Sequence, residues 1–279
     1  MESVLTLIVS ICSFLSLMKF TNADYRCIGH VCILDSYDKN IQPIQSESNY
    51  VYVNFRSIKI LKVDDEEFTI TLSLYLELIW TDRRVNVDSH FEDILFKNNT
   101  FTPINSAIID KIWVPAPYIF DLKSIKTKAR MLYLVDQKYI TYNRDLEISL
   151  YCYMVFDNYP IDSHVCYFKM NSFNHFEDKF IYKTTMITLA DSNEDIKMDG
   201  STMSNGKYLH QFNVLDYEVE LNKLTEDQST ILEKADEAGE ISKRPIAGFK
   251  IILHRKYRKY IIYYYVPSGL IAGISCVSI

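Results

Sequence analysis

Apolar and polar residues alternate with a period of two along much of the middle of the chain. In residues 68–80 (FTITLSLYLELIW) every second residue is apolar, from Phe68 to Trp80, whereas Tyr75 and Glu77 fall between them. Side chains of a β-strand point alternately to the two faces of a sheet. The pattern therefore predicts a half-buried strand that directs Tyr75 and Glu77 away from the core.

A second alternating segment lies at residues 139–150 (YITYNRDLEISL). Arg144 interrupts its apolar face, which comprises Ile140, Tyr142, Leu146, Ile148 and Leu150. Residues 50–61 and 247–254 are further predicted strands, and residues of turn-forming type such as 64–66 and 98–99 separate such segments. Many strands joined by short turns predict an all-β sandwich or barrel. One short helix is expected near Val31 to Tyr37.

The two termini are apolar. Residues 1–23 fit a secretory signal peptide, with a cut after Ala23, and the alternative is an uncleaved membrane anchor. Residues 260–279 carry no charge and follow the basic stretch 254–260 (HRKYRKY). Because about 20 apolar residues cross a bilayer, this segment is predicted to span a membrane, the alternative being a buried terminal helix or strand. We therefore expect an extracellular domain over residues 24–257.

An exported chain can oxidise its cysteines. Outside the two apolar termini four remain, and their simplest pairing joins Cys27 to Cys32 and Cys152 to Cys166, although sequence alone allows three connectivities. Asn98 begins an Asn-Asn-Thr sequon, which fits a glycosylated surface loop.

Composition and motifs exclude several classes of function. The net charge of −6 argues against nucleic acid as a partner, because no basic stripe is present to neutralise phosphates. The chain has no HExxH, GxSxG or phosphate-binding glycine motif, and its six histidines are scattered without metal-binding spacing. We therefore predict a protein that is not an enzyme and that needs no metal or cofactor.

The stretch 152–166 (CYMVFDNYPIDSHVC) predicts a closed and stiff loop. An aromatic residue before Pro160 favours a cis peptide, and Asp162 can accept backbone N–H groups within the turn. Phe156 and Tyr159 give the loop an apolar tip. Such a loop suits contact with another surface.

These residues resemble a known family. Cys152, Met154, Phe156, Tyr159-Pro160, Asp162 and Cys166 match the pattern of the Cys-loop (pentameric ligand-gated) ion channels. Residues 80–84 (WTDRR) resemble the family's W-x-D-x-R, and residues 113–115 (WVP) resemble its W-x-P-D with Ala116 in place of the Asp. Residues 265–279 resemble the first transmembrane helix of the GABA-, glycine- and glutamate-gated chloride branch, with Cys276 in place of a Trp. The resemblance covers roughly residues 31–279.

The resemblance implies an immunoglobulin-like β-sandwich of about ten strands with a short N-terminal helix, followed by one transmembrane helix that the sequence leaves incomplete. It implies a plasma-membrane subunit that assembles with four others and meets membrane lipid. A transmitter-like small molecule would bind between subunits, and an anion-selective pore would open. Coupling to the pore would pass through Phe156, Tyr159, Pro160 and Asp162. The alternative is a non-conducting secreted or tethered binding module of the same fold.

The resemblance also implies ligand-binding residues. Tyr118 and Phe173 match aromatic positions of the principal face of the interface, and Tyr75 and Tyr142 match positions of the complementary face. Glu77 stands where amino-acid-gated members often carry an Arg. As a solvated carboxylate, Glu77 is expected to disfavour a carboxylate ligand at this face.

Overall fold

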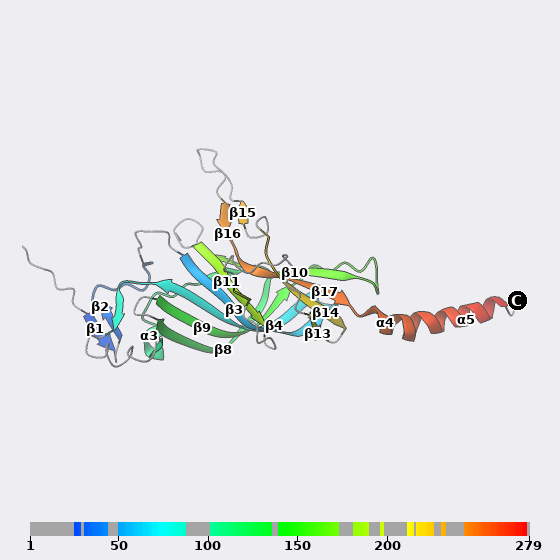
Figure 1. The fold of residues 1–279 in the computed structure, drawn as a ribbon, viewed down its shortest axis with the longest axis horizontal. Helices are drawn as coiled ribbons and strands as arrows, with labels where there is room; N and C mark the ends of the chain where they lie inside the picture. The colour runs from blue at the N-terminus through cyan, green and yellow to red at the C-terminus, as the bar shows by residue number, and fades with distance from the viewer. Residues whose placement is uncertain are drawn as a thin grey trace, which may run out of the picture.

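Two β-sheets packed face to face form the body of the protein in the computed structural model (Figure 1). The structure describes residues 25–28, 31–43, 50–87, 101–135, 139–172, 181–189, 196–197, 211–214, 216–225, 230–232 and 243–277. The predicted fold class, an all-β sandwich, is confirmed.

The larger sheet has seven strands. Their order is β12 (Ile196–Lys197), β11 (Ile181–Leu189), β3 (Tyr50–Asp64), β4 (Thr69–Thr81), β9 (Tyr139–Tyr151), β8 (Leu122–Val135) and β6 (Phe101–Ile104). Every neighbouring pair is antiparallel except β11 and β3, which run parallel.

The smaller sheet has five antiparallel strands. Their order is β13 (Gln211–Val214), β14 (Tyr217–Lys223), β17 (Ala247–Arg255), β10 (Ser163–Ser172) and β7 (Pro117–Ile119). A separate hairpin is formed by β15 (Thr230–Leu232) and β16 (Lys243–Pro245).

The core between the sheets is built by the alternation seen in the sequence. Phe55 of β3 packs edge-on against Phe168 and Phe249 of the smaller sheet, with ring centroids 5.2 Å apart in each pair. The even-numbered residues of β4 from Ile70 to Trp80 are buried, as predicted. Phe68 departs from the prediction, because it lies in the turn before β4 with a φ of 53° and is 45% exposed.

Strand β3 changes phase in its middle. Val51, Val53 and Phe55 are buried, but beyond Ser57 the buried residues are Ile58 and Ile60. Ser57 has a φ of 49°, and the register between β3 and β4 shifts between Arg56 and Lys59. This β-bulge inserts a residue and so keeps apolar side chains on the core face in both halves of the strand.

The expected helix near Val31 to Tyr37 is wrong. Residues Val31–Leu34 form strand β2, which pairs with β1 (Tyr25–Ile28) on one side and with β5 (Val85–Val87) on the other. Cys27 and Cys32 are direct cross-strand neighbours and form a disulfide. β-branched Val31 and Ile33 favour an extended backbone, and the disulfide holds the two strands in register.

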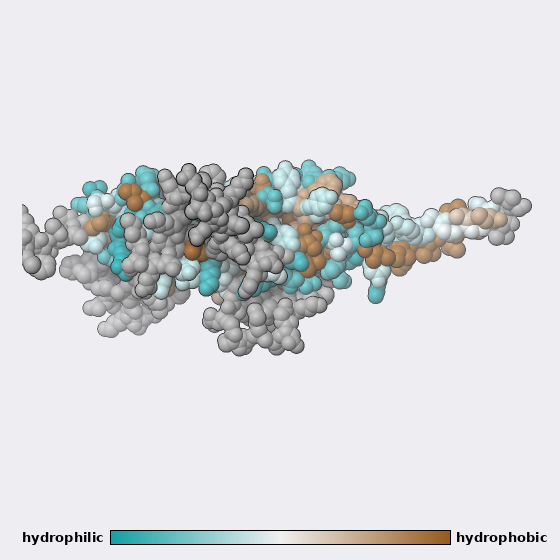
Figure 2. All heavy atoms as spheres, turned by 90° about the horizontal axis from the view of Figure 1, so that it is seen from above, coloured by the Kyte–Doolittle hydropathy of each residue, from teal (hydrophilic) through white to brown (hydrophobic). Residues whose placement is uncertain are grey.

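The chain leaves the sandwich at the end of β17 and enters a helical segment, at the right of Figure 1. This segment consists of α4 (Tyr257–Tyr260), the π-helix η1 (Ile261–Tyr265) and α5 (Val266–Val277). Figure 2 shows apolar residues along it, and Ile271 and Ile274 are more than 60% exposed. Among the described residues, no single helix has both the length and the apolar character needed to cross a membrane.

Candidate functional site: the disulfide loop and the polar sheet face

The loop predicted from the sequence is closed as expected. Cys152 and Cys166 form a disulfide with their Cα atoms 5.1 Å apart, and the peptide between Tyr159 and Pro160 is cis. The loop connects β9 in the larger sheet to β10 in the smaller one. It therefore bridges the two sheets at the end of the sandwich from which the helical segment departs.

Arg255, the last residue of β17, lies at the centre of a charged cluster that contacts this loop. Its Nε and Nη2 donate to the two carboxylate oxygens of Asp162 over 2.8 and 3.0 Å. Nη2 also lies 2.9 Å from Asp65, in the turn between β3 and β4. Asp65 accepts a hydrogen bond of 2.8 Å from the hydroxyl of Tyr217 in β14. The Arg255 side chain is 2% exposed, so a buried arginine ties together the loop and both sheets.

Aromatic rings complete the surroundings of the guanidinium. Its Cζ lies 4.6 Å from the ring centroid of Tyr217, 5.0 Å from Tyr159 and 5.6 Å from Phe156. Ring faces attract a cation through their quadrupole, most strongly where water is excluded. The cluster of Arg255, Asp162, Asp65, Tyr217, Phe156 and Tyr159 is called the arginine cluster below.

The arginine cluster shifts the pKa values of its members. Burial alone raises the pKa of Asp162, but the hydrogen bonds and charge of Arg255 outweigh burial, so the pKa of this carboxyl lies below its ordinary value. Burial lowers the pKa of Arg255, but bonds to Asp162 and Asp65 raise it above its usual value. Burial, followed by the bond to Asp65, raises the pKa of the Tyr217 hydroxyl. The ion pair is thus charged and the phenol neutral at physiological pH.

The loop and the cluster contact the start of the helical segment. Tyr159 packs edge-on against Tyr260 of α4 with ring centroids 5.5 Å apart. The Tyr260 hydroxyl donates to Asp216 over 3.1 Å, and Lys259 forms an ion pair with the same carboxylate. The backbone N–H of Lys256 donates to the Asp216 carbonyl over 2.8 Å. The loop and the end of β17 are therefore in direct contact with the first turn of the helix.

The residues predicted to couple the loop to the pore lie together beside the arginine cluster. They are Phe156, Tyr159, Pro160 and Asp162. Tyr159 is 45% exposed, whereas Phe156 packs inward against His164, with ring centroids 5.0 Å apart. Asp162, which was expected to accept backbone N–H groups within the turn, has a backbone hydrogen bond and also binds the guanidinium of Arg255, 93 residues away in the chain. Sequence reasoning missed Arg255, since a lone arginine within a basic run carries no local pattern that marks it as buried.

A second candidate surface is the outer face of the larger sheet. Tyr75 is 50% exposed on this face and lies beside Arg56 of β3 and Asp145 of β9 in the strand register. In the next row, Asn143 of β9 lies between Glu77 and Met131 of β8. Met131 is 54% exposed and accepts a hydrogen bond from the Tyr133 hydroxyl over 3.1 Å. Tyr75 and Met131 are thus exposed on the same face of the sheet, and Tyr133 is half-buried beside Met131; alternation in a single strand does not reveal this arrangement across strands.

Glu77 is not the solvated carboxylate that the sequence predicts. It is 7% exposed, accepts a hydrogen bond of 2.5 Å from the Asn54 amide and pairs with Arg56 over 2.9 Å. Arg56 itself is about half-exposed. The negative charge of Glu77 is therefore compensated, and the cation on this surface comes from the neighbouring strand. This geometry therefore does not support the expectation that Glu77 disfavours a carboxylate ligand at this face.

Tyr142 lies on the opposite face of the sheet from Tyr75. It is 8% exposed and pairs in register with Leu78 and Leu132, both of which are core residues. The alternation in the sequence had already assigned Tyr142 to the apolar face. A position on that face is at odds with the prediction that Tyr142 contacts a ligand over Tyr75. Met131 and Tyr133 occupy the outer face instead.

Tyr118 lies at the edge of the smaller sheet. It belongs to β7, is 46% exposed and packs edge-on against Phe120 with ring centroids 5.2 Å apart. Its register partner in β10 is Asn171. Tyr75 and Tyr118 therefore belong to different sheets. Phe173 and Asn98, the other predicted sites, lie outside the described residues.

The fold and the disulfide loop agree with one class of protein. Residues 30–236 match the family described as the neurotransmitter-gated ion-channel ligand binding domain, and the chain belongs to this family. Its relatives include the gamma-aminobutyric acid receptor subunit alpha-3 of Rattus norvegicus, which is 24% identical over 178 residues. The same subunit from Bos taurus and from Homo sapiens is 23% identical over the same length. Each match covers 62% of this chain and 34% of the relative, so the matched region spans about a third of these receptors.

Proposed function

We propose that the chain is the ligand-sensing part of a subunit of a pentameric ligand-gated ion channel. A transmitter-like small molecule binds between neighbouring subunits, and the loop 152–166 passes the signal to a membrane-spanning pore. The observation that carries this proposal is the arginine cluster, since it joins the loop to both sheets and contacts the helical segment through Tyr159.

The location of the exposed tyrosines supports a ligand site between subunits. Tyr75 lies in the middle of the larger sheet and Tyr118 at the edge of the smaller one. A ligand that contacts both residues therefore requires two copies of the domain, each of which presents one face. Aromatic side chains at such a site suit a ligand with a cationic group. The half-exposed Arg56 beside Tyr75 pairs with Glu77 over 2.9 Å, so this pair adds no net charge to the surface, and the aromatic side chains are the support for a ligand with a cationic group.

The pore is proposed to be anion-selective and to lie in the plasma membrane. The support for selectivity is the resemblance of residues 265–279 to the chloride branch and the similarity to gamma-aminobutyric acid receptor subunits. The support for the membrane location is the uncharged run 260–279, which begins directly beside the arginine cluster. The proposed partners are four further subunits and lipid.

Expression of the complete reading frame in oocytes, alone and with related subunits, tests this proposal. We expect transmitter-evoked current that reverses at the chloride equilibrium potential. Ligand binding at the cell surface without current, whichever partner is present, would contradict the proposal and favour a non-conducting binding module.

A further inference from the structure

The two disulfides in the described part of the chain differ in their exposure to solvent. Cys152 and Cys166 are 3% and 2% exposed and belong to the core. Cys32 is 6% exposed, but its partner Cys27 is an exposed residue of β1. A thiolate opens a disulfide by direct attack on one of the two sulfur atoms, so the attacked residue must be accessible. Access therefore distinguishes the bridge between Cys27 and Cys32 from the bridge that closes the loop 152–166.

Strand β1 lies at the edge of a small sheet, at the end of the sandwich remote from the helical segment (Figure 1). It pairs with β2 on one side, and no strand of the described structure pairs with its other side. Tyr25, Arg26 and Cys27 are exposed, and of its four residues Ile28 alone packs against the core. A small thiol can therefore approach β1 from its open edge.

The side-chain contacts that hold β1 are weak. Arg26 pairs with Asp35 over 3.5 Å, and the Asn86 amide donates to the Tyr25 hydroxyl over 3.3 Å. The Arg26 and Asp35 side chains are 78% and 49% exposed, and exposed ion pairs contribute little to stability. The disulfide is thus the main restraint on β1 besides its backbone pairing with β2.

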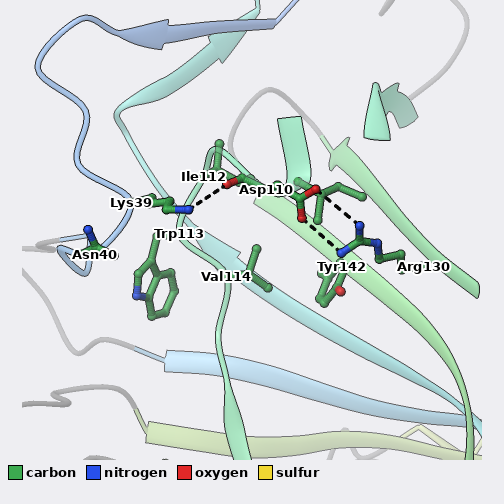
Figure 3. Close-up of a pocket in the computed structure, with 9 residues that line it drawn as sticks. Lys39, Asn40, Asp110, Ile112, Trp113, Val114, Arg130 and Tyr142 are labelled. Atoms are coloured by element: carbon green, nitrogen blue, oxygen red, sulfur yellow. Dashed lines mark hydrogen bonds and ion pairs between the residues drawn. The ribbon is translucent and has the colours of Figure 1, made fainter. Parts of the chain in front are cut away.

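Strand β2 is held independently of this disulfide. Its Val31 and Ile33 are core residues, and the strand pairs with β5 on the side away from β1. Beyond β2, Lys39 donates to the backbone carbonyl of Asp110 over 3.3 Å, and Figure 3 shows Lys39 directed toward this residue. Opening the disulfide should therefore release β1 and leave β2 in place.

We propose that the disulfide between Cys27 and Cys32 is a thiol-exchange site that small external thiols of the glutathione class open. The bridge between Cys152 and Cys166 stays closed under the same conditions. The inference goes beyond the proposed channel activity and does not rest on it, because it concerns the chemistry of one folded chain.

The exchange proceeds in two steps. A thiolate attacks the Sγ atom of Cys27 and forms a mixed disulfide, while the bond between the two protein sulfurs breaks and its electron pair leaves on Cys32, which takes up a proton. A second thiolate attacks the small-thiol sulfur of the mixed disulfide and releases the Cys27 thiolate, which is protonated in turn. Two thiols are thereby oxidised to one disulfide, and the protein disulfide is reduced to two thiols.

Differential alkylation of the purified full chain in detergent tests this site. The folded chain is incubated with reduced glutathione, newly formed thiols are trapped with N-ethylmaleimide, and peptide mass spectrometry reports each cysteine. Labelling of Cys27 and Cys32 should be at least about tenfold faster than labelling of the loop cysteines, because local unfolding must first expose the buried bridge. Cys276 is already a free thiol and provides an internal standard for alkylation.

The matched control is the same chain unfolded in urea, where both bridges are exposed. There the two bridges should open at rates within about threefold of each other, because burial no longer protects the loop. Equal rates in the folded chain, the same preference in urea, or no labelling of Cys27 by up to about 10 mM glutathione would each overturn the inference.

Hydrogen exchange measured by mass spectrometry is a second test, directed at the released strand. After glutathione treatment the amides of residues 25–28 should exchange about tenfold faster, whereas those of β10 should not change. The double variant Cys27→Ser with Cys32→Ser should show the same fast exchange without glutathione. Unchanged protection of β1 in the reduced chain and in this variant would overturn the inference that the disulfide holds the strand.

Discussion

At the residue scale, Arg255 shows why one side chain can connect several elements. A guanidinium presents five donors in a fixed plane, so it can bind Asp162 with two nitrogens and still reach Asp65. A lysine would place a single ammonium at this position and satisfy fewer acceptors. The Asp162 carboxylate is 2% exposed, and burying it would be costly without such a partner. The identity of the residue, and not only its charge, therefore determines the cluster.

Replacing Arg255 by Gln should destabilise the domain strongly. The change leaves Asp162 buried without its cation, and the free energy of unfolding should fall by about 3–5 kcal/mol. Arg258→Gln is the matched control, because Arg258 is an exposed residue of the same basic run. Denaturant unfolding of the chain in detergent measures both variants. A loss below about 1 kcal/mol for Arg255→Gln, or equal losses in both variants, would argue against a stabilising cluster.

The lowered pKa of Asp162 predicts an acid-sensitive stability. A carboxyl whose pKa is lower in the folded state than in the unfolded state stabilises the protein above its ordinary pKa of 3.8. This stabilisation should disappear as the pH falls below about 4, toward the folded pKa. Melting temperatures measured between about pH 6 and pH 3 should decline, and the decline should be shallower in Asp162→Asn. An identical decline in both proteins would assign the effect to other groups.

At the element scale, close contacts between strands restrict which residue types fit at a position. The alternation of apolar and polar residues does not reveal this restriction. Gly248 of β17 lies opposite Lys169 of β10, and its N–H donates over 2.9 Å to Thr184 of β11 in the other sheet. A Cβ atom at this position would lie 2.0 Å from the carbonyl oxygen of Phe168. Glycine is therefore required here by the approach of the neighbouring backbone.

Gly248→Ala should lower the free energy of unfolding by about 2–3 kcal/mol, since the backbone of β10 must move to accept the methyl group. Gly269→Ala in α5 is the control, because a Cβ there meets nothing within 4 Å in the described structure. Thermal unfolding of the two variants compares them directly. Equal stability of both would show that β10 shifts without strain.

The sequence predicted much of the fold because period-two alternation reports burial in each strand separately. It placed β4 and β9 correctly and assigned Tyr75 to the outer face. It failed for Glu77, since the burial of this side chain depends on Asn54 and Arg56 of a neighbouring strand. The bulge in β3 and the strand at Val31–Leu34 were likewise decided by pairing between distant segments.

At the scale of the whole molecule, the proposed functional surfaces lie at different places. The exposed tyrosines Tyr75 and Tyr118 lie on different sheets, and the arginine cluster lies where the helical segment departs. The family to which the chain belongs binds ligands in this domain. The proposed signal must therefore pass along the sandwich to the loop 152–166 and across the contact between Tyr159 and Tyr260.

The most direct test of this account is a double-mutant cycle on that contact. In the receptor formed by the complete reading frame, Tyr159→Ala and Tyr260→Ala are measured singly and together, by evoked current and by binding of a competitive antagonist. Each single change should raise the ligand concentration for half-maximal current about threefold to tenfold without weakening antagonist binding, and the double variant should resemble the singles because they share one contact. Additive shifts in the double variant, or currents that remain unchanged, would contradict the account.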